Sequence, residues 1–166
     1  GGIATYLTLD GGLGYMTAAK SMRFSDSMSA YFGGSNDLTI QHDGSNSYIN
    51  NGTGDLYIRQ NTDDKDIIFQ SDDGSGGTTA YLTLDGSAGH TTVQKEMNFA
   101  DSVEATFGTS NDLRVFHNGS HTYLSNQTGD LYIRNQADDK DIIFQSDNGA
   151  GGNATYFSLD GSSATH

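Results

Sequence analysis

A gapless internal repeat of 75 residues constrains this chain more than any other feature. The hexapeptide GDLYIR occurs at residues 54–59 and again at 129–134, and residues 1–75 match residues 76–150 at 45 of 75 positions. Residues 151–166 then begin a third copy. Repeat proteins bury hydrophobic faces by stacking units rather than around one central core. We therefore expect three segments, β repeat 1 (1–75), β repeat 2 (76–150) and the start of a third (151–166), cut from a longer array.

Apolar and polar residues alternate along each repeat, which is the period of a β-strand with one buried face. The alternation runs through residues 22–32 of the first copy and residues 97–107 of the second. Where the two copies differ in charge, as at Ser29 and Glu104, the difference lies on the polar parity. The sequence therefore predicts half-buried strands, with one face that tolerates charge.

Short strands between Gly, Asn, Asp and Ser turns explain the rest of the repeat. The predicted strands of the first copy are residues 38–42, 47–50, 55–59, 66–70 and 80–84. Residues 67–69 are apolar on both faces, which predicts burial in a sheet seam or against a neighbouring chain. Only residues 17–22 suggest a single helical turn. We expect an all-β, elongated, repetitive β-solenoid or β-helix-like fibre, stacked along one chain or interwound as a homotrimer.

Composition narrows the function classes. The chain has 8 basic and 21 acidic residues, a formal net charge of −13, no Pro and no Cys. This charge argues against binding nucleic acid or anionic lipid, which both require basic surfaces. No apolar run approaches the roughly 18 residues of a membrane-spanning helix. The absence of Pro suits continuous backbone pairing, and the absence of Cys excludes disulfides and thiolate metal sites.

Acidic turns are the first candidate metal ligands. Asp63, Asp64 and Asp66 recur as an equivalent set at residues 138–141, close to the acidic turns at 71–74 and 146–149. Clustered carboxylates suit Ca²⁺, which needs six to eight oxygen ligands. The spacing matches neither an EF-hand nor the calcium-binding nonapeptide repeat, so hydrated turn residues are the favoured interpretation.

Histidines are the second candidate. His42 and His117 occupy equivalent positions on the apolar parity, where three copies around a threefold axis could bring three imidazoles to one metal ion. The favoured alternative is a His that faces inward or lies at a turn edge, with a backbone partner. His90, His121 and His166 have no counterpart in the neighbouring copies and no shared role. We predict no metal site and no required cofactor, with calcium as the alternative.

The sequence contains no recognisable set of catalytic residues. No G-x-S-x-G motif occurs, no Ser–His–acid set can be defined, and nearly every acidic position is duplicated, whereas an active site is normally unique. A glycan-cleaving carboxylate pair therefore remains a minor third hypothesis. Six tyrosines in three equivalent pairs could stack on sugars, although strand packing is favoured: Tyr6, Tyr48, Tyr57, Tyr81, Tyr123 and Tyr132.

The motifs H-[DN]-G-S, TGDLYIR and DDKDIIFQSD resemble the shaft repeats of phage tail-fibre proteins, especially those of marine and cyanobacterial phages. The similarity covers the whole chain. It implies a homotrimeric β-structured shaft on a virion or in the extracellular space, with host binding placed in regions outside these residues. The leading hypothesis is a structural, non-enzymatic shaft segment that spaces a distal tip from its base. The alternative is a bacterial surface adhesin or matrix repeat that binds glycans, with or without calcium.

Overall fold

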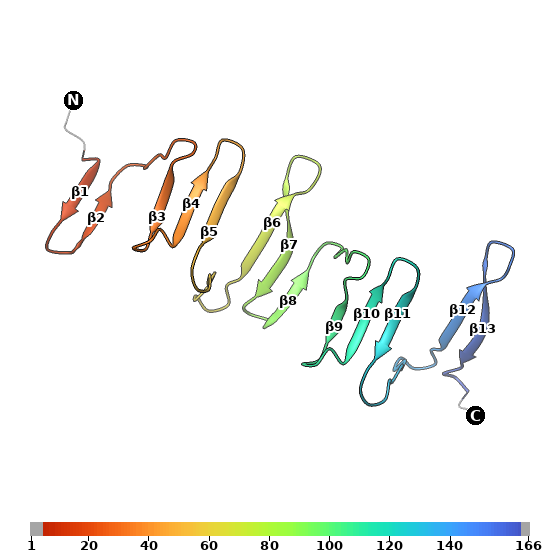
Figure 1. Cartoon of the computed structure of the whole chain (residues 1–166). Helices are drawn as coiled ribbons and strands as arrows, with labels where there is room; N and C mark the ends of the chain where they lie inside the picture. The colour runs from red at the N-terminus through yellow and green to blue at the C-terminus, as the bar shows by residue number, and fades with distance from the viewer. Residues whose placement is uncertain (1–4, 164–166) are drawn as a thin grey trace. The chain divides into compact units, whose positions relative to one another are not determined.

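A computed structural model describes residues 5–163 and contains only strands, turns and irregular segments, so the all-β prediction is confirmed. The predicted helical turn at residues 17–22 is wrong, because this stretch continues β2 and then bends. Figure 1 labels the thirteen strands. Their bounds are β1 Leu7–Asp10, β2 Tyr15–Ala18, β3 Ser29–Phe32, β4 Leu38–His42, β5 Ser47–Asn51, β6 Ile67–Asp72, β7 Thr78–Asp85, β8 His90–Val93, β9 Ala105–Phe107, β10 Leu113–His117, β11 Thr122–Asn126, β12 Ile142–Asp147 and β13 Asn153–Leu159.

Two kinds of small antiparallel sheet recur with the sequence period. The first kind is the three-stranded meander β3-β4-β5, which the second copy repeats as β9-β10-β11. The second kind is β6-β7-β8, in which a β-bulge shifts the register between Phe69 and Gln70. The two-stranded sheets are partial versions of this second kind, since β1-β2 corresponds in sequence to β7-β8, and β12-β13 corresponds to β6-β7.

The register gives each sheet one apolar face. In the meanders, Ala30 pairs with Ile40 and Ile40 with Ile49, so these side chains share a face. In the second kind of sheet, Phe69 pairs with Leu82 and Leu82 with Val93. The opposite faces carry mainly Ser, Thr, Tyr, Gln and charged residues, with Ile68, Ile143 and Phe116 as apolar exceptions. Alternation along the sequence therefore translates directly into two-faced sheets.

Most of the predicted strands are confirmed, and one is wrong. Residues 38–42 match β4, while 47–50, 66–70 and 80–84 fall in β5, β6 and β7 with shifted ends. Of the alternating stretch 22–32, only residues 29–32 form a strand. Residues 55–59 form no strand, and neither do their equivalents 130–134. These segments have strand-like composition, but among residues 5–163 no strand pairs with them to complete a ladder.

No hydrophobic core forms among residues 5–163. The only buried residue there is Thr83, with 9% of its surface exposed, and no apolar side chain is buried. The predicted half-burial of the strands is only partial in the single chain: Ala30, Leu38 and Leu82 are half-buried, whereas most strand residues are exposed. Strand contacts occur only between neighbours within the same sheet. Ile68 and Phe69 are each about half exposed, so no sheet seam covers them within the described chain.

The chain divides into two compact units, Gly1–Gln94 and Lys95–His166. The sequence boundary at residues 75/76 lies in the turn between β6 and β7, because β7 pairs with the strand of the preceding repeat. Within residues 5–163, every strand pair is antiparallel and no sheet closes into a solenoid. The fold shown is thus a series of separate small antiparallel sheets.

Candidate functional site

The uncovered apolar faces are the main candidate site. On the meander of the first copy, Phe24 and Met28 precede β3 and extend the face formed by Ala30, Ile40 and Ile49. Together they line an apolar hollow of about 520 Å³, with His42 and Ser47 at one end. Because apolar surface is stabilised when it leaves water, such a face is suited to binding another apolar surface.

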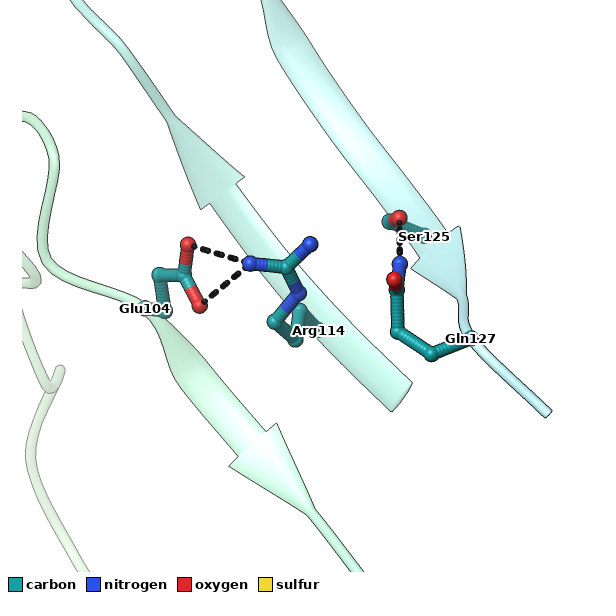
Figure 2. Close-up of polar contacts among 4 residues, drawn as sticks. All are labelled: Glu104, Arg114, Ser125 and Gln127. Carbon is teal, nitrogen blue, oxygen red and sulfur yellow. Dashed lines mark hydrogen bonds and ion pairs between the residues drawn. The ribbon is translucent and has the colours of Figure 1, made fainter. Parts of the chain in front are cut away.

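The opposite face of the second meander carries a polar cluster, drawn in Figure 2. Arg114 on β10 points toward Glu104, just before β9, with Nη1–O distances of 3.2 and 3.4 Å. Gln127 donates to the Ser125 hydroxyl on β11 at 2.7 Å. The first copy has Ser29 and Thr39 in place of Glu104 and Arg114. The structure thus confirms that the charge differences lie on the polar face.

That polar face also carries stacked rings. Phe116 and Tyr123 stack with ring centroids 4.9 Å apart, and the Arg114 guanidinium lies 5.8 Å from the Phe116 ring centroid. His121 meets Tyr123 edge-on at 6.4 Å. Because these groups pack mainly on one another, the arrangement stabilises the sheet without forming a chemical site.

The second candidate site is the pair of segments at residues 55–59 and 130–134, hereafter the DLYIR segments. Their backbone N–H and C=O groups make no hydrogen bond within the described chain. Tyr57 and Tyr132 are 70% and 74% exposed, and their hydroxyls donate to Asp55 and Asp130 at 3.3 and 3.5 Å. The Arg59 guanidinium lies 5.2 Å from the Tyr57 ring centroid. Polar side chains therefore interact along one side of the segment.

Hydrogen bonds fix the chain just before each DLYIR segment and again several residues after it. At the start, Asn51 Nδ2 donates to the carbonyls of Thr53 and Gly54 at 2.9 and 2.8 Å, and Asn126 repeats this geometry in the second copy. Gly54 has a φ of 66°, in the left-handed region that favours glycine. Beyond the other end, Asp66 Oδ1 accepts a 3.0 Å bond from the Gly86 amide. The segments are therefore held between defined anchors.

The acidic turns use their oxygens within the protein. Asp73 accepts hydrogen bonds from the Ser75 hydroxyl, the Ser75 amide and the Gly77 amide, and these bonds lower the pKa of Asp73. Asp64, with its equivalent Asp139, adopts a left-handed turn conformation. Among residues 5–163, no group of three His, Asp or Glu side chains could hold a metal ion. The geometry supports turn stabilisation at these positions.

Asp43 shows that this role does not require charge. Its carboxylate accepts from the amides of Asn46 and Ser45 and from the Tyr48 hydroxyl, and these bonds lower the pKa of Asp43. In the second copy, the neutral amide oxygen of Asn118 accepts from the equivalent backbone amides at 3.0 and 2.8 Å. This turn therefore needs only an acceptor oxygen at this position, which a neutral amide also supplies.

Three histidines, His42, His90 and His117, lie on strands and bond to hydroxyls. His42 Nδ1 lies 3.0 Å from the Ser47 hydroxyl across the β4–β5 pair, and His117 Nδ1 lies 3.1 Å from the Thr122 hydroxyl. The predicted position at a turn edge is correct, although the imidazole partner is a side chain rather than backbone. His90 bonds to Thr92 at 3.1 Å. His166 lies outside the described residues.

The remaining tyrosines behave mainly as sheet residues. Tyr81, opposite the β6 bulge, donates to the carbonyl of Asp72 at 3.0 Å, and Tyr156 repeats this bond to Asp147 at 3.0 Å. Tyr6 is largely exposed. Only Tyr57 and Tyr132, on the DLYIR segments, combine high exposure with a strand-like segment that has no partner.

Sequence reasoning missed the bond between Asp66 and Gly86, because the residues are 20 positions apart and no local motif joins them. It also missed that the DLYIR segments lack partner strands. The sequence offered one signal: the DLYIR segments are identical in the two copies, which indicates that these residues are constrained but does not identify the cause.

Within residues 5–163, no helix is long and apolar enough to cross a membrane. Comparisons with known families, curated proteins and solved structures find no match to this chain.

Proposed function

We propose that this chain is a structural segment of an extracellular or virion fibre, a shaft that self-associates and spaces a distal binding region from its base. The observation that carries the proposal is that every sheet has an apolar face and no apolar residue is buried within the described chain. An isolated sheet of two or three strands is at best marginally stable in water. The proposed assembly supplies the missing second layer.

A second copy of the same chain is the partner that the repeat favours. The apolar faces recur every 75 residues, so whatever covers them must present a matching surface at the same interval. A second copy of the chain presents the same apolar faces at the same interval, so it meets this requirement. The polar faces, with the Glu104–Arg114 pair, then remain in water. Because of the resemblance to tail-fibre repeats, we propose a homotrimer with the apolar faces turned toward a common axis.

The test is the solution mass of the chain by size-exclusion chromatography with light scattering. We expect an elongated particle of three times the 17.7 kDa chain mass. Ile40→Asp places a charge on the apolar face of β4 and should dissociate the particle. Gln41→Asp adds the same charge next to it on the opposite face and should leave the mass unchanged. A folded monomer, or equal effects of the two substitutions, would contradict the proposal.

A second candidate function is a surface repeat that binds glycans. Tyr57 and Tyr132 are exposed beside the carboxylates of Asp55 and Asp130, a pairing of aromatic ring and acceptor that suits a sugar. A glycan array probed with the wild-type chain and with Tyr57→Ala/Tyr132→Ala, with and without calcium, would test this role. Binding that the substitutions abolish would favour it over the purely structural role.

A further inference from the structure

The DLYIR segments are extended in composition and alternation like strands, but no backbone pairs with them within the described residues. In the first copy, Asn51 fixes the chain just before the segment, and Asp66 fixes it again seven residues after Arg59. Between these anchors, no backbone group of residues 55–59 or 130–134 pairs within the described chain. Unpaired edges of strands bind other strands unless the protein prevents it. An ordered, exposed segment of this kind is therefore a template for pairing.

The segment is complementary to itself in one orientation. If two copies lie antiparallel with Tyr57 opposite Tyr57, then Asp55 faces Arg59 and Leu56 faces Ile58. Opposite charges and aromatic pairs across strands are stabilising. In a parallel, in-register pair, Asp55 would face Asp55 and Arg59 would face Arg59, which is destabilising. Charge complementarity therefore selects the antiparallel arrangement and selects a second copy of the same sequence.

We infer that DLYIR segments of two copies pair as antiparallel β-strands centred on Tyr57 or Tyr132. Chains related by a threefold axis cannot place the same segment antiparallel to itself, because a rotation of one third does not reverse a strand. The contact therefore joins chains of two different shafts side by side. This inference rests on the proposed function for the existence of shafts, and it goes beyond that function in predicting their lateral association.

The repeat doubles the number of possible contacts. Each chain presents the segment twice, 75 residues apart in the sequence, and so has two positions at which it can pair. Single exposed charge pairs contribute little, and the net charge of −13 opposes the approach of two shafts. We therefore expect association that depends on protein concentration and on salt.

Charge reversal tests the pairing directly. In the variant Asp55→Arg/Asp130→Arg, arginine would face arginine across the contact, and lateral association should weaken at least about tenfold. Net charge alone predicts stronger association of this variant, because the variant is less acidic than the wild type and the shafts repel each other less. Asp63→Arg/Asp138→Arg makes the same change of net charge outside the segment and is the matched control. Adding Arg59→Asp/Arg134→Asp to the first variant restores opposite charges across the strands and should restore association.

Mass distributions by sedimentation velocity separate the outcomes. Shafts that associate further in wild type, separate to single trimers in the reversed variant, and associate again in the swapped variant would support the inference. A wild type that stays a single trimer at all concentrations would overturn it and leave the proposed function standing. A reversed variant that falls to monomers would place the contact inside the shaft and also overturn it. A wild type that is only monomeric would contradict both proposals.

Discussion

The amide of Gly86 donates a 3.0 Å hydrogen bond to Oδ1 of Asp66, 20 residues earlier, and Gly161 makes the same bond to Asp141. The bond holds the start of β6 against the turn that follows β7. An ideal Cβ on Gly86 would overlap the carbonyl oxygen of Lys65, so this contact requires glycine.

Gly86→Ala should therefore destabilise the protein by about 1–3 kcal/mol, because backbone must move to admit the methyl group. Gly161→Ala should behave alike, since its Cβ would overlap the Lys140 carbonyl. Gly11 occupies the equivalent position in the sequence, but nothing lies within 4 Å of its Cβ. Urea unfolding should show little effect of Gly11→Ala, and equal losses at all three positions would contradict the explanation.

Asp66→Ala should cost about 1–2 kcal/mol, because the Gly86 amide loses its acceptor. Asp66→Asn retains Oδ1 as an acceptor and should recover most of the loss. Chemical denaturation of the two variants at neutral pH compares them. If the two substitutions were equally destabilising, the carboxylate charge would matter more than the hydrogen bond.

Stability should fall in acid because of the turn carboxylates. Hydrogen bonds from backbone amides and hydroxyls lower the pKa of Asp43, Asp73, Asp85 and Asp160 from 3.8. A group with a lowered folded pKa stabilises the protein above its unfolded pKa, and this contribution is lost as pH falls through the folded value. Thermal melts should therefore show constant stability from these groups above about pH 5 and a decline below pH 4.

Asp43→Asn isolates one of these groups. Asn118 supports the same turn in the second copy with a neutral amide, so folding at pH 7 should be nearly unchanged. Between about pH 5 and pH 3, the range in which an ordinary Asp titrates, the variant should lose less stability than the wild type. The reason is that it lacks one carboxylate that becomes protonated on acidification. Identical acid profiles for the two proteins would show that Asp43 contributes nothing to the pH dependence.

The Glu104–Arg114 ion pair should contribute little. Its side chains are about one third exposed, Glu104 bonds through one guanidinium nitrogen only, and Arg114 Nε is buried without a partner. A double-mutant cycle with Glu104→Gln and Arg114→Gln should give a coupling energy below about 1 kcal/mol that decreases with salt. The first copy already lacks this pair and forms the same meander. A coupling of several kcal/mol would mean that the pair becomes buried in an assembly.

Folding should be coupled to association, because the described chain buries no apolar side chain. The melting temperature should therefore rise with protein concentration, as mass action requires when assembly stabilises the folded state. Circular dichroism melts over a hundredfold range of concentration measure this. A melting temperature independent of concentration would show that the single chain folds alone.

The DLYIR segments show where sequence reasoning fails. Like β4, they alternate polar and apolar residues and contain a β-branched side chain, yet β4 forms a strand and they do not. Composition reports whether a segment suits a strand, but a ladder also needs a second backbone alongside. Asp66 and Gly86 show the complementary limit, because a bond across 20 residues leaves no local pattern to read.

The sequence by itself determined the 75-residue period, the all-β class, most strand positions and the two-faced character of each sheet. These properties are local, because side chains alternate along a strand and turns need particular residues. Only the tertiary structure decided which strands pair, that the sheets remain separate, and that their apolar faces are left uncovered within the chain. Pairing and burial depend on segments far apart in the sequence, and here on the absence of a second layer around each sheet.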